Sequence, residues 1–455
     1  MGCAESRECF APDIEHSGSE YNAAVIERCP LLTERYRPPS LWGRNGHAQC
    51  IVFCTLGRQY AHSTPGVQAT MVALKSAQDG TTITFDMFVR EDVGRARAQA
   101  EDAPWVLIAP GICNWSQSDY VQSFVQYALH VHPHWRVAVL NHLGTDSRML
   151  PTSARVFNLG CCEPFDLMVK HIHRRWPDAP LVALGFSMGA NIILKYLGED
   201  PSRQALFSAA VSCCQSYVFS PSLEYYEHSL LLRFYSSVIA RRVLGLVKPH
   251  RSMYFNYWRR AGYIRDGGDG SAMASEKNQD TEELLGPTRP VHACNDPDST
   301  CRKNAVANAR FPPGINLTTA DDGGEGSIVE NVHEDVVFSS YHMGDLDRNF
   351  FRPMNGYATV HDYYAAMSSA FYLHKVTDVP VMLLNADDDP VAPPEDVYHH
   401  ARTILDVNPR SLFVHTRHGS HMAYYSGGCV LPDDHNVFDQ MLLQYITAVL
   451  SMPDR

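Results

Sequence analysis

Residues 181–191 read Leu-Val-Ala-Leu-Gly-Phe-Ser-Met-Gly-Ala-Asn. The apolar run Leu181–Leu184 predicts a buried strand, and the apolar residues between Ala190 and Leu197 recur with the spacing of a helix. A G-x-S-x-G pentapeptide lies between them, which puts Ser187 on a sharp turn from strand to helix. The pentapeptide alone also occurs in ordinary loops, but the flanking strand and helix favour a nucleophile. The turn needs glycine on both sides because a Cβ there would collide with the neighbouring strand and helix.

Strands and helices alternate on both sides of this turn. We predict buried strands at Trp105–Ala109, Val137–Leu140, Ala209–Cys213, Val379–Leu384 and Leu412–Val414. We predict helices at Tyr120–Leu129, Asp166–Trp176 and Phe438–Leu450, and an edge hairpin formed by Val67–Leu74 and Thr81–Phe88. The order indicates an α/β fold with a mostly parallel, doubly wound sheet. In such sheets the functional residues gather at the carboxyl ends of the strands.

A serine nucleophile needs a base and a residue that orients the base. In folds with this serine turn, the chain order is serine, acid, histidine. Three adjacent aspartates, residues 387–389, follow the predicted strand Val379–Leu384. The Asp-Pro-x-x-Pro pattern favours Asp389 as the acid, with Asp388 as the alternative.

The base is expected after the last predicted strand, where residues 418–421 read His-Gly-Ser-His. We predict His421, because two small residues before it allow the loop to carry the imidazole to Ser187. His418 is the competing candidate.

Backbone amides complete the predicted site. The small residues after Trp105–Ala109 would let the Ile112 amide face an oxyanion, and the Met188 amide follows the nucleophile directly. These groups suffice for acyl transfer, so we expect neither a metal nor an organic cofactor.

The region after Cys213 interrupts the alternation. Residues 217–263 are rich in aromatic residues, leucine and arginine, and residues 336–372 regain helical spacing, so both are predicted to form a helical cap. Residues 265–330 are rich in glycine, proline and aspartate, a composition typical of a disordered insertion. The predicted organisation is a flexible N-terminus (1–28), a first core part (29–215), the cap with its insertion (216–375) and a second core part (376–455). Residues 10–30 are expected to form a poorly structured lead-in to the core.

Composition limits the partners and the compartment. The chain has 455 residues and a formal net charge of −12, which argues against a nucleic-acid partner and against a general attraction to anionic lipid. Its 13 cysteines are scattered and odd in number, which favours free thiols.

The N-terminus reads Met-Gly-Cys-Ala-Glu-Ser, a pattern for myristoylation at Gly2, and Cys3 is a candidate for palmitoylation. Two acyl chains would hold the protein at the cytoplasmic face of a membrane, whereas an unmodified terminus would be flexible.

Several motifs resemble those of the AB hydrolase 4 family. They include Pro110-Gly-Ile, Asn141-His-Leu-Gly, Gly185-Phe-Ser-Met-Gly and Asn385-Ala, and the resemblance extends from about residue 29 to the C-terminus without the insertion. It implies an α/β-hydrolase fold and a membrane-associated serine hydrolase of lipid esters, with Ser187, Asp389 and His421 as the triad.

The family includes monoacylglycerol lipases, one of them steroid-responsive, and phospholipid hydrolases. The resemblance therefore implies a monoacylglycerol lipase first and a phospholipase second, with a steroid as a candidate ligand. A lipid- or steroid-binding protein without catalysis is the alternative from another class. Two departures stand out: the family's usual transmembrane anchor is missing, and its Gly-Gly-His is Gly419-Ser420-His421 here.

Overall fold

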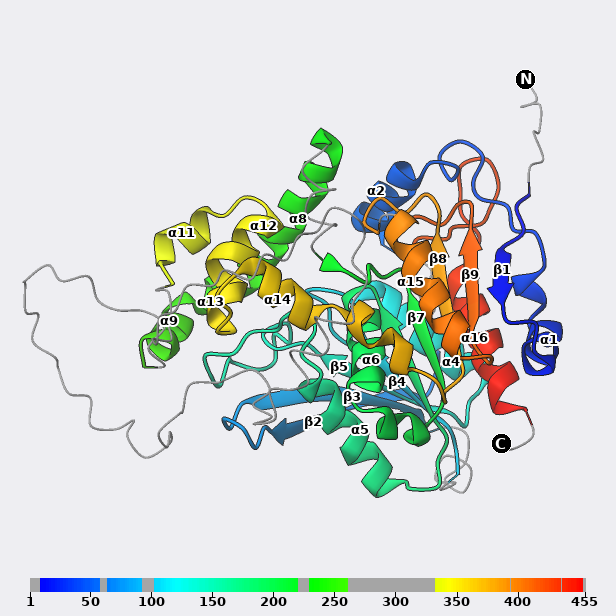
Figure 1. Cartoon of the computed structure of the whole chain (residues 1–455), viewed down its shortest axis with the longest axis horizontal. Coiled ribbons are helices and arrows are strands. Elements are labelled where there is room, and N and C mark those ends of the chain that lie inside the picture. Colours follow the sequence, from blue (N-terminus) through cyan, green and yellow to red (C-terminus); the bar gives the residue numbers. More distant parts are fainter. Residues whose placement is uncertain are drawn as a thin grey trace, which may run out of the picture.

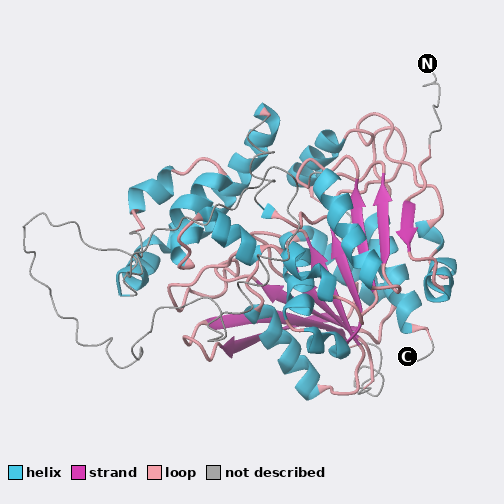
Figure 2. Ribbon diagram, in the orientation of Figure 1, coloured by secondary structure: helices cyan, strands magenta, loops and turns pink. Residues whose placement is uncertain are grey.

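A nine-stranded sheet runs through the centre of the molecule (Figures 1 and 2). The computed structural model describes residues 9–57, 64–91, 102–219, 229–260, 332–392, 394–434 and 436–452. The strand order is β1-β9-β8-β7-β6-β4-β5-β3-β2. The strands are β1 (Asp13–His16), β2 (Val67–Lys75), β3 (Thr82–Arg90), β4 (Trp105–Ala109), β5 (Arg136–Asn141), β6 (Leu181–Phe186), β7 (Phe207–Cys213), β8 (Val381–Ala386) and β9 (Leu412–Thr416).

Strands β4 to β9 pair in parallel, whereas β2, β3 and β1 join the two edges in antiparallel pairs. The predicted mostly parallel α/β sheet is therefore confirmed, and so is the hairpin at its edge. The carboxyl ends of the parallel strands meet at one edge, where the predicted site residues lie.

Helices cover both faces of the sheet. On one face, Trp105, Leu107 and Ala109 of β4 share a core with α5 (Glu163–Arg175), α6 (Met188–Glu199) and α15 (Pro394–Val407). On the other, Val106 and Ile108 pack with α4 (Asp119–Val131) and α16 (Val437–Leu450). Successive side chains of a strand point to opposite faces, so a strand buried on both sides is apolar throughout. This explains the doubly wound arrangement.

The prediction of a poorly structured lead-in at residues 10–30 is wrong. This segment forms β1, α1 (Glu20–Glu27) and the short turn η1 (Pro30–Leu32). Strand β1 pairs with β9, and the buried Asn22 side chain donates to the carbonyls of Pro409, at 2.9 Å, and Ser411, at 3.1 Å. The segment is ordered by partners almost 400 residues away, which local composition does not reveal.

Residues of the predicted cap form helices, most of which lie to one side of the sheet (Figure 1), whereas residues 369–375 pack on α6. They are α8 (Leu230–Val247), η3 (Lys248–His250), α9 (Arg251–Arg260), α11 (Glu334–Ser339), α12 (Met343–Leu346), η5 (Asp347–Phe351), α13 (Arg352–Met354), α14 (Val360–Met367) and η6 (Ser369–Lys375). The remaining elements are α2 (Gly46–Leu56) and η2 (Pro201–Leu206). Within the described ranges, no helix combines the length and the apolar character needed to cross a membrane. The predicted insertion at 265–330 and the lipidation candidates Gly2 and Cys3 lie outside the described residues.

Candidate active site

Ser187 occupies a strained turn between β6 and α6. Its backbone has φ 53° and ψ −116°, a conformation that L residues rarely adopt, and its amide donates to the Cys213 carbonyl at 2.8 Å. A Cβ at Gly185 would lie 2.4 Å from Cα of Ala190, and one at Gly189 would lie 1.9 Å from the Ala109 carbonyl oxygen. Glycine is therefore required on both sides of the serine, as the sequence predicts.

The structure brings Ser187, His421 and Asp389 into one hydrogen-bonded chain. Nε2 of His421 lies 2.9 Å from Oγ of Ser187, and Nδ1 of His421 lies 2.8 Å from Oδ2 of Asp389. Asp389 is buried, and its other oxygen accepts the amides of Val391 at 2.7 Å and Ala392 at 3.1 Å. These amides fix the carboxylate, so that one oxygen remains directed at the imidazole. This arrangement can transfer a proton from the serine hydroxyl to the histidine.

Each of the three adjacent aspartates contacts a different histidine. The distances are 3.1 Å for Asp387 and His415, 3.3 Å for Asp388 and His418, and 2.8 Å for Asp389 and His421. The parallel pairing of β8 with β9 sets this pattern, because the turns after the two strands run side by side. Within the described residues, His421 rather than His418 contacts Ser187.

Asp388, the alternative acid, holds the loop that carries His421. Its Oδ1 accepts the amides of Gly419 at 3.0 Å and Ser420 at 2.7 Å. The Ser420 hydroxyl in turn donates to the Gly46 carbonyl at 2.6 Å. Sequence reasoning considered Asp388 only as a competitor for Asp389 and missed this positioning contact.

The predicted oxyanion amides belong to the residue after Ser187 and to the loop after β4, the strand that pairs with β6. Met188 begins α6, where the first amides have no helical partner, and Ile112 follows β4. Within the described part of the chain, neither amide donates to a protein acceptor. Both amides therefore remain candidates for holding an oxyanion.

A buried histidine supports the Ile112 loop. His142 lies 2.8 Å, through Nε2, from the Pro110 carbonyl, and burial lowers the pKa of His142 to about 4. A neutral imidazole that donates from Nε2 satisfies this contact. Tyr120 accepts the Gly111 amide at 2.7 Å, and Asn141 accepts the Ser116 amide at 2.9 Å. In the sequence, Asn141-His142 is recognised only as part of a family motif, and its role in shaping this loop is missed. The position of these two residues at the end of a predicted strand could have indicated that role.

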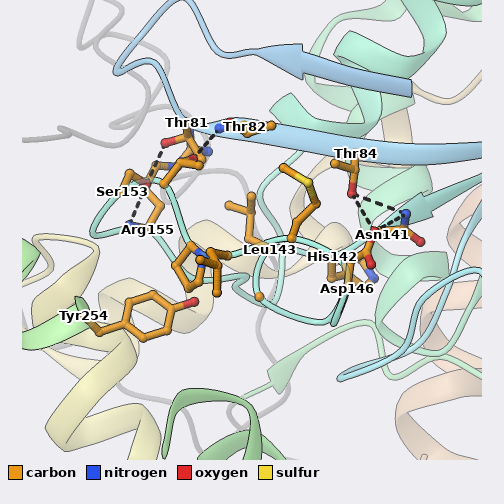
Figure 3. A pocket seen from close by; sticks show the side chains of 15 residues that line it. Thr81, Thr82, Thr84, Asn141, His142, Leu143, Asp146, Ser153, Arg155 and Tyr254 are labelled. Carbon is orange, nitrogen blue, oxygen red and sulfur yellow. Dashed lines mark hydrogen bonds between the residues drawn. The ribbon is translucent and has the colours of Figure 1, made fainter. Parts of the chain in front are cut away.

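A small cavity with a mixed polar and apolar lining lies between His142 and Tyr254 of α9 (Figure 3). Its volume is about 30 Å³, and its lining includes Thr84, Asn141, His142 and Tyr254. This space suits one or two water molecules and is too small for a lipid.

His47 joins α2 to the cap. Its Nδ1 lies 3.2 Å from the Tyr235 hydroxyl, and the two rings are nearly parallel with centroids 5.8 Å apart. Cys50 of α2 packs with Leu232 and Tyr235 of α8 in the same place. The contact is structural, and it holds one end of the cap beside the loop of His421.

Comparison with known proteins places these observations in a family context. A family model described as the alpha/beta hydrolase fold matches residues 104–237. Mouse monoacylglycerol lipase ABHD2 is 28% identical over 439 residues, covering 96% of this chain and 85% of the mouse protein. Human phospholipase ABHD3 is 25% identical over 443 residues, with 96% of this chain and 85% of the human protein covered. Among solved structures, esterase Est22 aligns with a TM-score of 0.40 at 11% identity, over 90% of this chain and 91% of that chain.

Proposed function

We propose that the chain is a serine hydrolase that cleaves lipid esters, with a monoacylglycerol as the preferred substrate. The order of its strands and the match of residues 104–237 to the alpha/beta hydrolase fold support the proposal. The products would be glycerol and a fatty acid. The observation that carries the proposal is the chain of hydrogen bonds from Asp389 through His421 to Ser187.

The geometry supports a two-step acyl transfer. Oγ of Ser187 attacks the acyl carbon while Nε2 of His421 takes its proton, and the carbonyl oxygen becomes an oxyanion held by the amides of Ile112 and Met188. The tetrahedral intermediate collapses, the ester bond breaks, and His421 gives the proton to the departing glycerol oxygen. Water then attacks the acyl-enzyme with the same help from His421, and the fatty acid leaves. Asp389 orients the imidazole and stabilises its charged form.

Two observations support the class of substrate. Relatives that match this chain over 96% of its length are named monoacylglycerol lipase, and their names specify a carboxylic ester of a lipid. A relative named phospholipase matches to a similar extent at lower identity, so hydrolysis of glycerophospholipids is the second candidate. The complete hydrogen-bonded triad argues against a silent lipid- or steroid-binding protein, because binding alone does not require these three residues together.

The place of action is a separate part of the proposal. A lipid hydrolase meets its substrate at an interface, and acylation of Gly2 and Cys3 would hold the chain at the cytoplasmic face of a membrane. Gly2→Ala should then move the protein from the membrane pellet to the soluble fraction of cells. Regulation by a steroid rests on the family resemblance alone.

A lipid panel tests the substrate. Purified wild type and Ser187→Ala are compared on monoacylglycerols, lysophospholipids and phosphatidylcholine by measuring released fatty acid. We expect wild type to favour the monoacylglycerol and Ser187→Ala to release none above background. If wild type prefers a phospholipid, the protein is a phospholipase instead of a monoacylglycerol lipase. If wild type and Ser187→Ala are equally active, the proposed mechanism is wrong.

A further inference from the structure

Exposed apolar side chains gather at one end of the molecule. Among the described residues, twelve large apolar side chains are exposed, and seven of them come from three segments, one of which contacts the other two. We call these seven the apolar rim: Leu41, Ile51, Leu230, Leu231, Phe234, Val430 and Leu431. Their exposed fractions reach 84% at Leu230 and 73% at Leu431, so these side chains are largely open to solvent. An exposed cluster of this kind marks an interaction surface more often than a single exposed leucine does.

Contacts join residues 35–57 to each of the other two segments of the rim. The Leu41 amide donates to the Cys429 carbonyl at 3.0 Å, and the Trp42 indole donates to the Val430 carbonyl at 2.8 Å. The contact of His47 with Tyr235 joins α2, which carries Ile51, to α8, which carries Leu230, Leu231 and Phe234. In Figure 1, α2 and α8 lie at the same end of the molecule.

The rim also adjoins the candidate active site. The Ser420 hydroxyl donates to the Gly46 carbonyl, which ties the loop of His421 to the first residue of α2. A Cβ at Gly46 would lie 1.8 Å from the Asp388 carbonyl oxygen, so α2 begins in direct contact with the turn that carries the acid. A surface that docks on the rim therefore lies next to Ser187 and His421.

The charge of the rim differs from that of the whole chain. Residues 35–57 and 229–251 contain eight arginines and lysines and no aspartate or glutamate, although the chain carries a formal net charge of −12. The third segment adds the exposed Asp433 and Asp434, so the three segments together remain basic. Arg233 is exposed between Leu231 and Phe234 in the sequence of α8. A hydrogen bond from Cys50 lowers the pKa of the Cys54 thiol of α2, and the exposed Arg242 lies close enough to lower this pKa further. Apolar side chains flanked by cations are typical of a segment that lies in a lipid headgroup layer. The negative net charge of the chain therefore says little about how this end meets a membrane.

We propose that the apolar rim docks on the surface of a phospholipid bilayer and so brings Ser187 to esters held in that surface. The apolar side chains of the rim would be buried in the lipid, and Arg233 and Arg242 would attract anionic headgroups. The inference rests on the proposed function for its biological purpose, but the binding itself does not require catalysis.

Sedimentation with vesicles tests the rim directly. The full chain is prepared as Gly2→Ala, so that no N-terminal acyl group contributes, and is mixed with vesicles of phosphatidylcholine with or without phosphatidylserine. Two rim variants are compared: Leu230→Ser with Phe234→Ser, and Leu41→Ser with Leu431→Ser. The matched control carries Val131→Ser and Leu150→Ser, two exposed apolar residues outside the rim. A further variant, Arg233→Gln with Arg242→Gln, tests the charge.

We expect each rim variant to lower vesicle partitioning by at least about tenfold, because each loses two side chains that would enter the lipid. The control should bind like the parent chain. Phosphatidylserine should increase vesicle binding of the parent chain but not of the arginine variant. All variants should retain turnover of a water-soluble short-chain ester. Rim variants that bind like the parent, or a control that loses binding equally, would overturn the inference. Adding Ser187→Ala should leave vesicle binding unchanged, so a failure of the proposed catalysis is distinguishable from a failure of the docking surface.

Discussion

At the scale of single residues, the choice among the adjacent aspartates shows how far sequence reasoning reaches. The position of the acid in the turn after a strand could be predicted, because the order of the triad and the end of the strand are both visible in the sequence. The direction of each carboxylate could not, since neighbouring side chains in a turn diverge. The pairing of β8 with β9 separates the three, and Asp389 is the one directed at the imidazole of His421.

Substituting Asp389 and Asp388 in turn should distinguish two roles: Asp389 orients the imidazole of His421, and Asp388 holds the loop that carries His421. Asp389→Asn should lower kcat on a short-chain ester about 10³–10⁴-fold, because an amide favours the wrong tautomer of His421. Asp388→Asn should lower kcat far less, because its amide oxygen can still accept from Gly419 and Ser420. Steady-state kinetics with both variants measures the difference, and the reverse ranking would move the acid to Asp388.

The glycine at position 189 should tolerate no side chain. Gly189→Ala would place a Cβ 1.9 Å from the Ala109 carbonyl oxygen, so β4 or α6 must shift. We expect destabilisation of roughly 1–3 kcal/mol or more and loss of esterase activity, seen in thermal unfolding and in turnover. Gly245→Ala in α8 is the matched control, since nothing lies within 4 Å of its added Cβ. Equal stability of the two variants would contradict the tight packing behind Ser187.

At the scale of elements, strands made of continuous apolar residues could be predicted from the sequence, whereas the structure of the N-terminal segment could not. Strands β4 and β6 are apolar on both faces, which the sequence displays directly. By contrast, β1 and α1 depend on β9 and on the carbonyl of Pro409, contacts that no local pattern encodes. The cap helices could be predicted as apolar segments, but their packing on the core could not be inferred from their spacing.

One element of the cap carries a buried acid. Asp347 lies in η5 and accepts the Tyr364 hydroxyl at 2.7 Å, and burial raises the pKa of Asp347 from 3.8 to about 7. The folded state therefore holds this proton more tightly than the unfolded state does. The resulting loss of stability begins as the pH rises above about 4 and is complete above about pH 7.

Replacing this acid with its neutral amide should stabilise the cap at neutral pH. We expect Asp347→Asn to unfold at a higher temperature than wild type at pH 8 and to lose that advantage as the pH falls toward 4. The gain should be roughly 1–3 kcal/mol, the usual cost of a buried polar group with incomplete partners. Thermal unfolding between pH 4 and pH 8 measures it, with the exposed Asp335→Asn as control. A destabilised Asp347→Asn at pH 8 would mean that the carboxylate is ionised and paired.

At the scale of the whole molecule, the α/β sheet and the candidate triad follow from the sequence because both depend on strand ends in a fixed order. The surface does not follow in the same way. The negative net charge predicts no attraction to anionic lipid, yet the apolar rim lies beside cations of α8 and of residues 35–44. This combination only becomes visible once distant segments are brought together.

The insertion at 265–330 is a separate prediction at this scale, because its composition offers little apolar surface to bury. Deleting residues 266–326 should leave a folded protein with near wild-type turnover of a short-chain ester. Soluble yield, thermal unfolding and esterase activity of the deletion variant provide the check. Loss of soluble expression or of turnover would show that the insertion belongs to the cap.

The central claim is that Ser187 is a nucleophile activated by His421 and oriented through Asp389. Covalent labelling with a fluorophosphonate, followed by mass spectrometry of the digested protein, tests it most directly, because the probe reacts only with an activated serine. We expect the adduct on the peptide that contains Ser187, none in Ser187→Ala, and at least a hundredfold slower labelling in His421→Ala. An adduct on another serine, or labelling of His421→Ala at the wild-type rate, would contradict the account.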